Sequence, residues 1–286
     1  MAVVLITGCS SGFGLEAALA FARNGDTVCA TMRNLAKADA LRKRVADEGV
    51  EVDLEEIDVT NDASVAAGVA AVADRLGPID ALVNNAGVGY GGPVETMPFD
   101  AAQALMDTNF WGAVRMTRAV LPGMREQRSG AIINVTSLSG LIPGALYTGL
   151  YAASKHALGA LSESLAGEVA PFGIRVVCVA PGFFATEISS NNEATDDGIA
   201  GSAYDADASW WASFMANSVA GGADARVVAD VIVAAASDPA TPAQVPVGAD
   251  AELYLSLWSQ TGTYEKWMEA AIPVVEMTAG PRPSPA

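Results

Sequence analysis

The sequence is poor in the residues that build metal sites, disulfide frames and nucleic-acid surfaces. It has one histidine, His156, which excludes a zinc site that needs two or three imidazoles. Its 16 lysines and arginines stand against 33 acidic residues, and the net charge of −17 argues against nucleic acid or an anionic membrane surface as partner. Cys9, Cys29 and Cys178 lie in separate apolar stretches, without a CxxC spacing. They are typical of buried thiols in a reducing compartment.

Targeting signals and long hydrophobic runs are also missing. The first residues, MAVVLITG, lack the charged region and the long apolar run of a signal peptide. No window approaches the roughly 18 apolar residues that a membrane helix needs. What is present is 51% hydrophobic residues over 286 positions, enough for one large core. We therefore expect a globular cytoplasmic protein without a membrane partner.

Short β-branched runs alternate regularly with longer helical patterns. The expected strands are 2–7, 27–32, 52–57, 79–84, 131–136, 174–180 and, more weakly, 244–247. After the first run, Leu15, Ala18, Leu19 and Ala22 follow helical spacing, and Gly25 stands where a C-terminal cap belongs. Strands that are apolar throughout, separated by helices, indicate a parallel sheet covered on both faces. The sequence predicts one doubly wound α/β (Rossmann) domain over 1–245, with about seven strands.

Residues 189–222 interrupt this rhythm. They contain no lysine or arginine, and Trp210, Trp211, Phe214 and Met215 stand at helical spacing. So long a segment inside a compact domain is often functional, and it is interpreted as a lid over the substrate. Plain core packing or a subunit contact is the alternative.

The C-terminal part has its own pattern. Leu253, Tyr254, Leu257 and Trp258 have helical periodicity, so 246–278 is expected to be a helical extension that covers the pocket or a neighbouring subunit. The Pro-rich end, 279–286, is expected to be a flexible tail.

A glycine-rich turn, TGxxxGxG at 7–14, lies between the first strand and its helix. Such a turn lets the backbone approach a pyrophosphate, and the helix N-terminus favours the anion. The expected cofactor contacts in it are Gly8, Ser10, Ser11, Gly12, Phe13 and Gly14.

The end of the second strand indicates which cofactor binds. NAD-binding sheets of this type usually carry an acidic residue there, on the ribose 2′-hydroxyl. Here the position is Met32, followed by Arg33. A guanidinium matches a 2′-phosphate in charge and geometry, so NADP(H) is predicted in preference to NAD(H). A merely solvated Arg33 is the alternative.

The strongest chemical signal is Tyr151-Ala-Ala-Ser-Lys155, at the start of a long helix. Spacing i, i+4 places the phenol and the ammonium on one helical face. A nearby cation stabilises phenolate and brings tyrosine toward acid/base work at neutral pH. Ser137 ends the fifth strand, facing the crevice where doubly wound sheets bind ligands.

Together these motifs resemble the short-chain dehydrogenase/reductase family, in its compact YxxxK branch. The resemblance spans about 2–190 and rests on the following motifs in order: TGxxxGxG at 7–14, Asp58-Val59-Thr60, Asn84-Asn85-Ala86-Gly87, Asn109, Ser137, YxxxK at 151–155, and Pro181-Gly182 through Thr186. Val4–Gly14, 33–35 and 136–140 further resemble the steroid- and retinol-dehydrogenase subgroup. A sugar-nucleotide epimerase of the longer branch would instead carry TGxxGxxG.

The resemblance implies a role for each matched residue. Tyr151 is the implied acid/base, Lys155 its modulator and a ribose contact, Ser137 the residue that orients the substrate oxygen, and Asn109 the holder of a relay water. The other implied cofactor contacts are Asp58, Val59, Asn85, Ala86, Gly87, Pro181, Gly182 and Thr186. The Ser-to-Tyr interval is one residue longer than the family leads us to expect. Ser139 is therefore an alternative to Ser137, whereas Tyr147 has no lysine four residues on and is rejected as the acid.

The predicted substrate is a bulky apolar secondary alcohol, ketone or aldehyde, because the residues expected near the crevice are apolar. They are Leu141, Ile142, Leu146, Phe183, Phe184, Trp210, Trp211 and Phe214. A 3-ketoacyl reductase, and a catalytically silent NADP(H)-binding sensor or scaffold, stay open as alternatives. By family resemblance the protein is expected to form a homodimer or homotetramer through helices near 99–125 and 150–171.

Overall fold

The computed structural model describes residues 1–185 and 199–284. Within them the chain forms a parallel seven-stranded sheet in the order β3-β2-β1-β4-β5-β6-β7. The strands are β1 (Val3–Ile6), β2 (Thr27–Met32), β3 (Asp53–Glu56), β4 (Ala81–Asn84), β5 (Gly130–Val135), β6 (Ile174–Pro181) and β7 (Gln244–Val247). The expected doubly wound fold is confirmed, including the weak last strand.

Helices connect the strands and continue beyond the last one. They are α1 (Gly12–Arg23), α2 (Asp39–Glu48), α3 (Asp62–Leu76), α4 (Phe99–Met106), α5 (Gly112–Gln127), α6 (Gly149–Val169), α7 (Asp205–Ala220), α8 (Ala225–Ser237), α9 (Ala249–Thr261) and α10 (Tyr264–Ala279). A π-helical turn, Asp107–Trp111, joins α4 to α5, and a 3-10 turn, Leu138–Gly140, follows β5.

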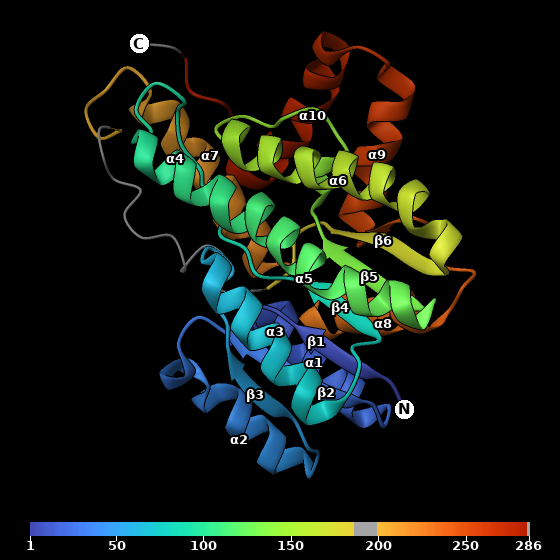
Figure 1. The fold of residues 1–286 in the computed structure, drawn as a ribbon. Helices are drawn as coiled ribbons and strands as arrows, with labels where there is room; N and C mark the ends of the chain where they lie inside the picture. The colour runs from blue at the N-terminus through green and yellow to red at the C-terminus, as the bar shows by residue number, and fades with distance from the viewer. Residues whose placement is uncertain (186–198, 285–286) are drawn as a thin grey trace.

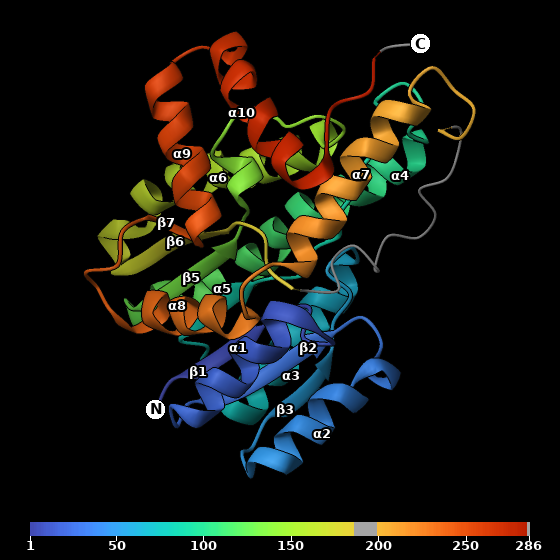
Figure 2. The ribbon, with the colours of Figure 1, turned by 180° about the vertical axis from the view of Figure 1, so that it is seen from behind.

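Two hydrophobic layers cover the two faces of the sheet. Helices α3, α5 and α6 pack on one face, and α1, α2 and α8 on the other, as the opposite views in Figures 1 and 2 show. Alternate strand residues belong to different layers: Val4 and Ile6 face α1, whereas Leu5 faces the α3 side. Both faces being apolar explains why the strands read as continuous hydrophobic runs.

Helix α1 follows from its sequence pattern. Its apolar residues are buried against the sheet, and Asn24 forms the C-cap. Gly25 then takes a φ of +87°, and its N–H donates to the Ala22 carbonyl while that of Asp26 donates to Phe21. These two bonds form the Schellman motif, which needs a residue that tolerates the left-handed region. The expected glycine cap is in place.

The topology brings the functional motifs to one edge. Because all strands are parallel, the residues that follow β1, β4, β5 and β6 meet at the carboxyl edge of the sheet. The connection after β1 runs to one face, and that after β4 to the other. Such a switch between neighbouring strands opens a crevice for a ligand.

The C-terminal helices form a separate hydrophobic region over this edge. Tyr254 of α9 and Trp267 of α10 pack with Leu138 and Ile142. Helix α7 packs against α10 through Trp210 and Val275. Figure 2 shows α7, α9 and α10 together on this side. The expected helix at 210–215 is part of α7, while 186–198 lie outside the described residues.

The end of the chain differs from the expected flexible tail. Helix α10 continues to Ala279, and Arg282 forms an ion pair with Asp207 in α7. The charged side chain of Arg282 holds this segment onto the molecule, a contact that a Pro-rich composition does not reveal.

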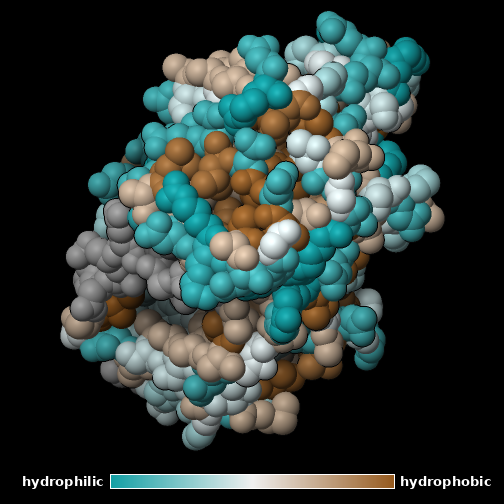
Figure 3. All heavy atoms as spheres, turned by 90° about the horizontal axis from the view of Figure 1, so that it is seen from below, coloured by the Kyte–Doolittle hydropathy of each residue, from teal (hydrophilic) through white to brown (hydrophobic). Residues whose placement is uncertain are grey.

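Several large apolar side chains are exposed. Val94, Phe99 and Trp111, in and before α4 and its π-helical turn, are 69%, 77% and 51% exposed. Figure 3, which views the molecule from below Figure 1, shows hydrophobic atoms in patches among a largely hydrophilic surface. Among the helices described, none combines the length and apolarity needed to span a bilayer.

Candidate active site

Ser137, Tyr151 and Lys155 meet at the carboxyl end of β5. Ser137 lies close enough to the phenol of Tyr151 to lower its pKa, and its Oγ accepts the backbone N–H of Ser139. Lys155, one turn further along α6, is 3% exposed, and its Nζ lies 5.8 Å from the Tyr151 ring centroid. The same Nζ donates to the carbonyl of Val135 at 3.0 Å. The structure thus brings the three expected catalytic side chains together, with Ser137 rather than Ser139 on the phenol.

Burial shifts the pKa of both titratable groups toward their neutral forms. It lowers the pKa of Lys155 to about 8, and among the described residues no carboxylate is bonded to this ammonium. Burial also raises the pKa of Tyr151, although the hydrogen bond from Ser137 opposes the shift. Shifts of this kind on adjacent groups at a sheet crevice are typical of acid/base sites.

Asn109 lies beside this group, within the π-helical turn. Its Oδ1 accepts the N–H of Val88 at 2.8 Å, and its Nδ2 donates to Ser154 Oγ at 3.1 Å and to the Val88 carbonyl at 2.9 Å. The side chain is 1% exposed, so it fixes the loop after β4 against α6. π-helical turns interrupt the regular helix ladder and occur often at functional sites.

The glycine turn leaves no room for a side chain at Gly8 or Gly14. A β-carbon at Gly14 would lie 2.4 Å from the Gly8 carbonyl oxygen, and one at Gly8, whose φ is +72°, 2.8 Å from Ala86 Cα. Asn85 bridges the turn by donating from Nδ2 to the carbonyls of Thr7 and Gly8, at 2.9 and 3.1 Å. Residues 85 and 86 also donate their N–H groups to Thr7 Oγ1.

The start of α1 suits a bound pyrophosphate. In this described segment the N-cap Ser11 makes no side-chain cap bond, and the first turn has no acidic residue. Backbone N–H groups of an uncapped first turn favour an anion, and Gly12 and Gly14 present no β-carbon to a phosphate. Beside it, a β-carbon at Gly87 would lie 3.6 Å from Lys155 Nζ. These residues fit a nicotinamide dinucleotide.

Arg33 and Asp58, which the sequence predicts to contact the adenosine part of the cofactor, follow neighbouring strands. Arg33 follows β2 directly and is exposed, and Asp58 comes two residues after β3. Asp58 Oδ1 accepts the N–H of Thr60 at 2.9 Å and its hydroxyl at 2.7 Å, which fixes the turn. The neighbouring Val59 is buried against Gly112. The adenosine-side candidates therefore surround one corner of the sheet.

A carboxylate that the sequence did not reveal fixes the loop after β6. Asp250, in the first turn of α9, accepts the Phe183 N–H at 2.6 Å. A β-carbon at Gly182 would lie 2.1 Å from this carboxylate, so Asp250 reaches the loop only because residue 182 is glycine. Pro181 ends β6, one residue beyond the expected strand, and Thr186 lies outside the described residues.

Most of the expected substrate residues form one aromatic cluster. Trp210, Trp211 and Phe214 of α7 pack against Leu146 and Phe183. Leu141 is half-buried beyond the 3-10 turn and, within the described chain, is not part of this cluster.

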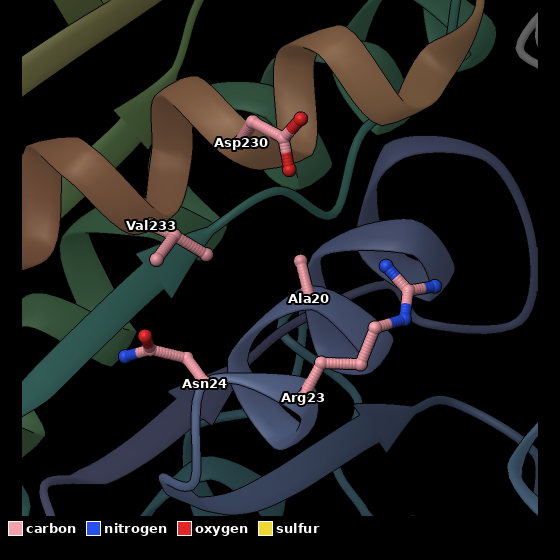
Figure 4. Close-up of a pocket in the computed structure, with 5 residues that line it drawn as sticks. All are labelled: Ala20, Arg23, Asn24, Asp230 and Val233. Atoms are coloured by element: carbon pink, nitrogen blue, oxygen red, sulfur yellow. The ribbon is translucent and has the colours of Figure 1, made fainter. Parts of the chain in front are cut away.

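Two hollows of the described surface lie away from this site. One, shown in Figure 4, is lined by Ala20, Arg23, Asn24, Asp230 and Val233, where α1 ends against α8. Because α1 starts at the carboxyl edge, its end lies at the opposite edge, remote from Tyr151. Another is an apolar groove between α3 and α5.

Two further residues were missed although they belong to known motifs. Thr7 opens the glycine turn and bonds the loop after β4, and Ser154 precedes the lysine of YxxxK and bonds Asn109. Their place inside the two motifs was the available signal. Asp250 had no such signal, because its partner is 67 positions away.

The comparisons with known proteins agree with this site. A family model described as short chain dehydrogenase matches residues 2–197. Human retinol dehydrogenase 8 is 43% identical over 188 residues, which cover 64% of this chain and 59% of that protein. A 3-ketodihydrosphingosine reductase of Bacteroides thetaiotaomicron is 40% identical over 194 residues, covering 68% of each chain.

Solved structures show the same fold. A short-chain dehydrogenase from Streptomyces avermitilis superposes with a TM-score of 0.80 at 34% identity, covering 94% of this chain and 97% of that one. A gluconate 5-dehydrogenase from Burkholderia cenocepacia, solved with NADP and tartrate, gives 0.72 at 28% identity, covering 88% and 95%. The chain belongs to the short-chain dehydrogenase family, whose members are nicotinamide-dependent oxidoreductases acting on CH–OH groups.

Proposed function

We propose that this protein is an NADP(H)-dependent oxidoreductase that interconverts apolar secondary alcohols and ketones, or acts on apolar aldehydes. The observation that carries the proposal is the grouping of Ser137, Tyr151 and Lys155, in which Lys155 Nζ lies 5.8 Å from the Tyr151 ring centroid and Ser137 acts on the phenol's pKa. Ser137, Tyr151 and Lys155 lie at the crevice, next to a glycine turn that fits a dinucleotide. This arrangement supports acid/base chemistry on a substrate oxygen.

In the reductive direction, Tyr151 would give its phenolic proton to the substrate oxygen. Ser137, on the same phenol, would donate to that oxygen and stabilise its developing charge. Lys155, in its charged form, would lower the phenol's pKa in the assembled site and hold the nicotinamide ribose. A nicotinamide held by these residues would supply or accept the hydride. Asn109 would anchor the loop after β4 and a water between it and Lys155.

The variant Tyr151→Phe, which removes only the phenolic oxygen, tests the acid/base role. NADPH consumption, followed by absorbance against carbonyls from aromatic aldehydes to polycyclic ketones, is expected to fall at least about 100-fold. NADPH binding, followed by fluorescence, is expected to stay unchanged. Equal turnover by the variant contradicts the assignment.

The preference for NADP(H) rests on Arg33. Arg33 follows β2 directly, next to Met32, which occupies the position where an acidic residue would favour NAD(H). The gluconate 5-dehydrogenase neighbour was solved with NADP. Arg33→Ala is expected to weaken NADPH by about 1.5–3 kcal/mol, the size of a charge-assisted contact, and to leave NADH almost unchanged. An equal loss for both cofactors contradicts the 2′-phosphate contact; Arg42→Ala is the matched control.

An apolar substrate is supported by the cluster of Trp211, Phe214, Leu146 and Phe183. Retinol and 3-ketodihydrosphingosine, after which two relatives are named, are both long apolar molecules with a reacting oxygen. In this proposal α7 covers the substrate, with Leu141 on the opposite rim.

A 3-ketoacyl reductase is the second candidate. A putative ketoacyl reductase of a Streptomyces virginiae polyketide synthase is 40% identical over 189 residues. The net charge of −17 disfavours docking of an acidic carrier. Turnover of an acyl thioester, but of no simple ketone, would establish this reading. Binding of NADPH without turnover of any substrate, in either direction, would favour the sensor.

We also propose a homo-oligomer in a reducing compartment, the cytoplasm. Exposed Phe99 and Trp111 lie on the α4–α5 side expected to pair, and the three cysteines are buried and free.

A further inference from the structure

Three segments far apart in sequence meet at the carboxylate of Asp207. The phenol of Tyr147 donates to its Oδ2 at 2.6 Å. Arg282 donates from Nε to Oδ1 at 2.7 Å and from Nη2 to Oδ2 at 2.6 Å. Tyr147 lies four residues before Tyr151, Asp207 in the first turn of α7, and Arg282 beyond α10. The contact therefore joins the loop that leads into the catalytic helix to the end of the chain.

Tyr147 needs external support, because its φ is +58°. A tyrosine in the left-handed region is strained, and surrounding contacts must hold it there. Its carbonyl accepts the Gly92 N–H at 2.7 Å, and its phenol is held by Asp207. The next residue, Thr148, accepts the first helical N–H of α6, from Ala152. The conformation of residue 147 thus leads directly into the start of the catalytic helix.

The guanidinium of Arg282 is itself held in place. It lies over the Trp210 ring, 5.7 Å from the centroid, and Trp210 Nε1 donates to the Gly280 carbonyl at 2.8 Å. The backbone N–H of Arg282 donates to Glu276. A bidentate pair to a prearranged arginine is stronger and more directional than a single surface contact.

The network keeps its charges at neutral pH. Arg282 holds the pKa of Asp207 below its usual range, so the carboxylate stays ionised as acceptor. Burial and the bond to Asp207 raise the pKa of Tyr147 to about 12, so the phenol stays protonated as donor. The phenol's single proton is used in this bond, and Tyr147 therefore supports the loop instead of acting as an acid.

We propose that Asp207 and Arg282 are positioning residues for the substrate side of the active site. They hold Tyr147, and through it loop 141–148, which carries Leu146 into the aromatic cluster. The effect on substrate rests on the proposed oxidoreductase function, whereas the hold on the loop does not. Among the described residues, the glycine turn 8–14 shares no hydrogen bond with Tyr147, Asp207 or Arg282.

Amide hydrogen exchange tests the hold on the loop without any assay of activity. Arg282→Ala and Tyr147→Phe are expected to speed exchange in peptides spanning 141–148 by about tenfold, with no change at 8–14. Arg226→Ala, which removes an exposed ion pair with Asp224 on α8, is the matched control. Unchanged exchange in 141–148 in both variants would overturn the proposal.

Kinetics tests the consequence for substrate. Arg282→Ala is expected to raise KM for the best carbonyl about fivefold, to leave kcat within about twofold, and Arg282→Lys to recover part of the loss. The double variant with Tyr147→Phe is expected to be no worse than the worse single variant, because one network is broken. Unchanged KM, or additive losses, in an active enzyme would overturn the proposal. Wild-type inactivity with every substrate would instead refute the proposed function, and the exchange data would still decide the hold on the loop.

Discussion

At the scale of single residues, Gly14 shows how little space the cofactor turn leaves. A β-carbon there would lie 2.4 Å from both the Gly8 carbonyl oxygen and Asn85 Nδ2. Gly14→Ala is expected to destabilise the fold by about 1–3 kcal/mol, because backbone must shift, and to weaken NADPH binding. Urea unfolding and NADPH fluorescence measure the two effects.

Gly167, in α6, is the matched control for this substitution. A β-carbon there would meet nothing outside its own helix within 4 Å. Gly167→Ala is therefore expected to stabilise the protein by about 0.5–1 kcal/mol through helix propensity. Equal changes in the free energy of unfolding for Gly14→Ala and Gly167→Ala would show that close packing at Gly14 does not cause the loss of stability.

Lys155 links catalysis to stability through pH. Burial lowers its pKa from the ordinary 10.5 to about 8, so between these values the unfolded chain binds more protons than the folded one. Stability from this group is therefore lowest below about pH 8 and rises toward pH 10.5. Lys155→Met is expected to raise the free energy of unfolding at pH 7 by about 1–3 kcal/mol, and less at pH 9, while turnover is lost. Urea unfolding at both pH values checks this, and a variant less stable at pH 7 would contradict it.

At the scale of elements, a buried amide chain holds the catalytic helix to the sheet. Asn134 of β5 accepts from Asn84 of β4 at 2.8 Å, and donates to Ser162 of α6 at 2.8 Å. Asn134→Ala is expected to lower the free energy of unfolding by about 1–3 kcal/mol, because buried polar partners lose their bonds. Ser164→Ala, an exposed hydroxyl on the same helix, is the control in the same urea titration. Equal effects of the two would show that the amide chain is not needed.

The sequence was informative where local chemistry decides the structure. The alternation of apolar runs with helical patterns predicts the strands. The Gly25 cap and the Tyr151–Lys155 spacing are also predictable, because each depends on residues within one turn of a helix. The sequence does not predict side-chain contacts between residues that are far apart along the chain. Asp250 reaches Phe183, and Arg282 reaches Asp207, over 67 and 75 positions, and neither pair has a local signature. The flexible tail was expected for the same reason, since composition shows no partner in α7.

At the scale of the whole molecule, the exposed apolar side chains point to assembly. Phe99 and Trp111 are large and exposed, and they lie on the α4–α5 side that we propose to pair. Replacing both with aspartate is expected to shift the sedimenting species to a smaller mass. Met277→Asp, at an 80% exposed position of α10, is the control. A monomeric wild type at micromolar concentration would refute the homo-oligomer.

The strand order has a consequence for synthesis of the chain. The first strand made, β1, ends in the middle of the sheet, and later strands are added outward on both sides until β7 closes one edge. Domains fold as units, so this domain completes its fold only after β7 and the C-terminal helices have been made. The residues of the phosphate cradle, after β1 and β4, are therefore among the first added to the chain, whereas Arg282 is among the last. A chain that ended at residue 281 would keep the glycine turn 8–14 but would lack the arginine that pairs with Asp207 and holds loop 141–148.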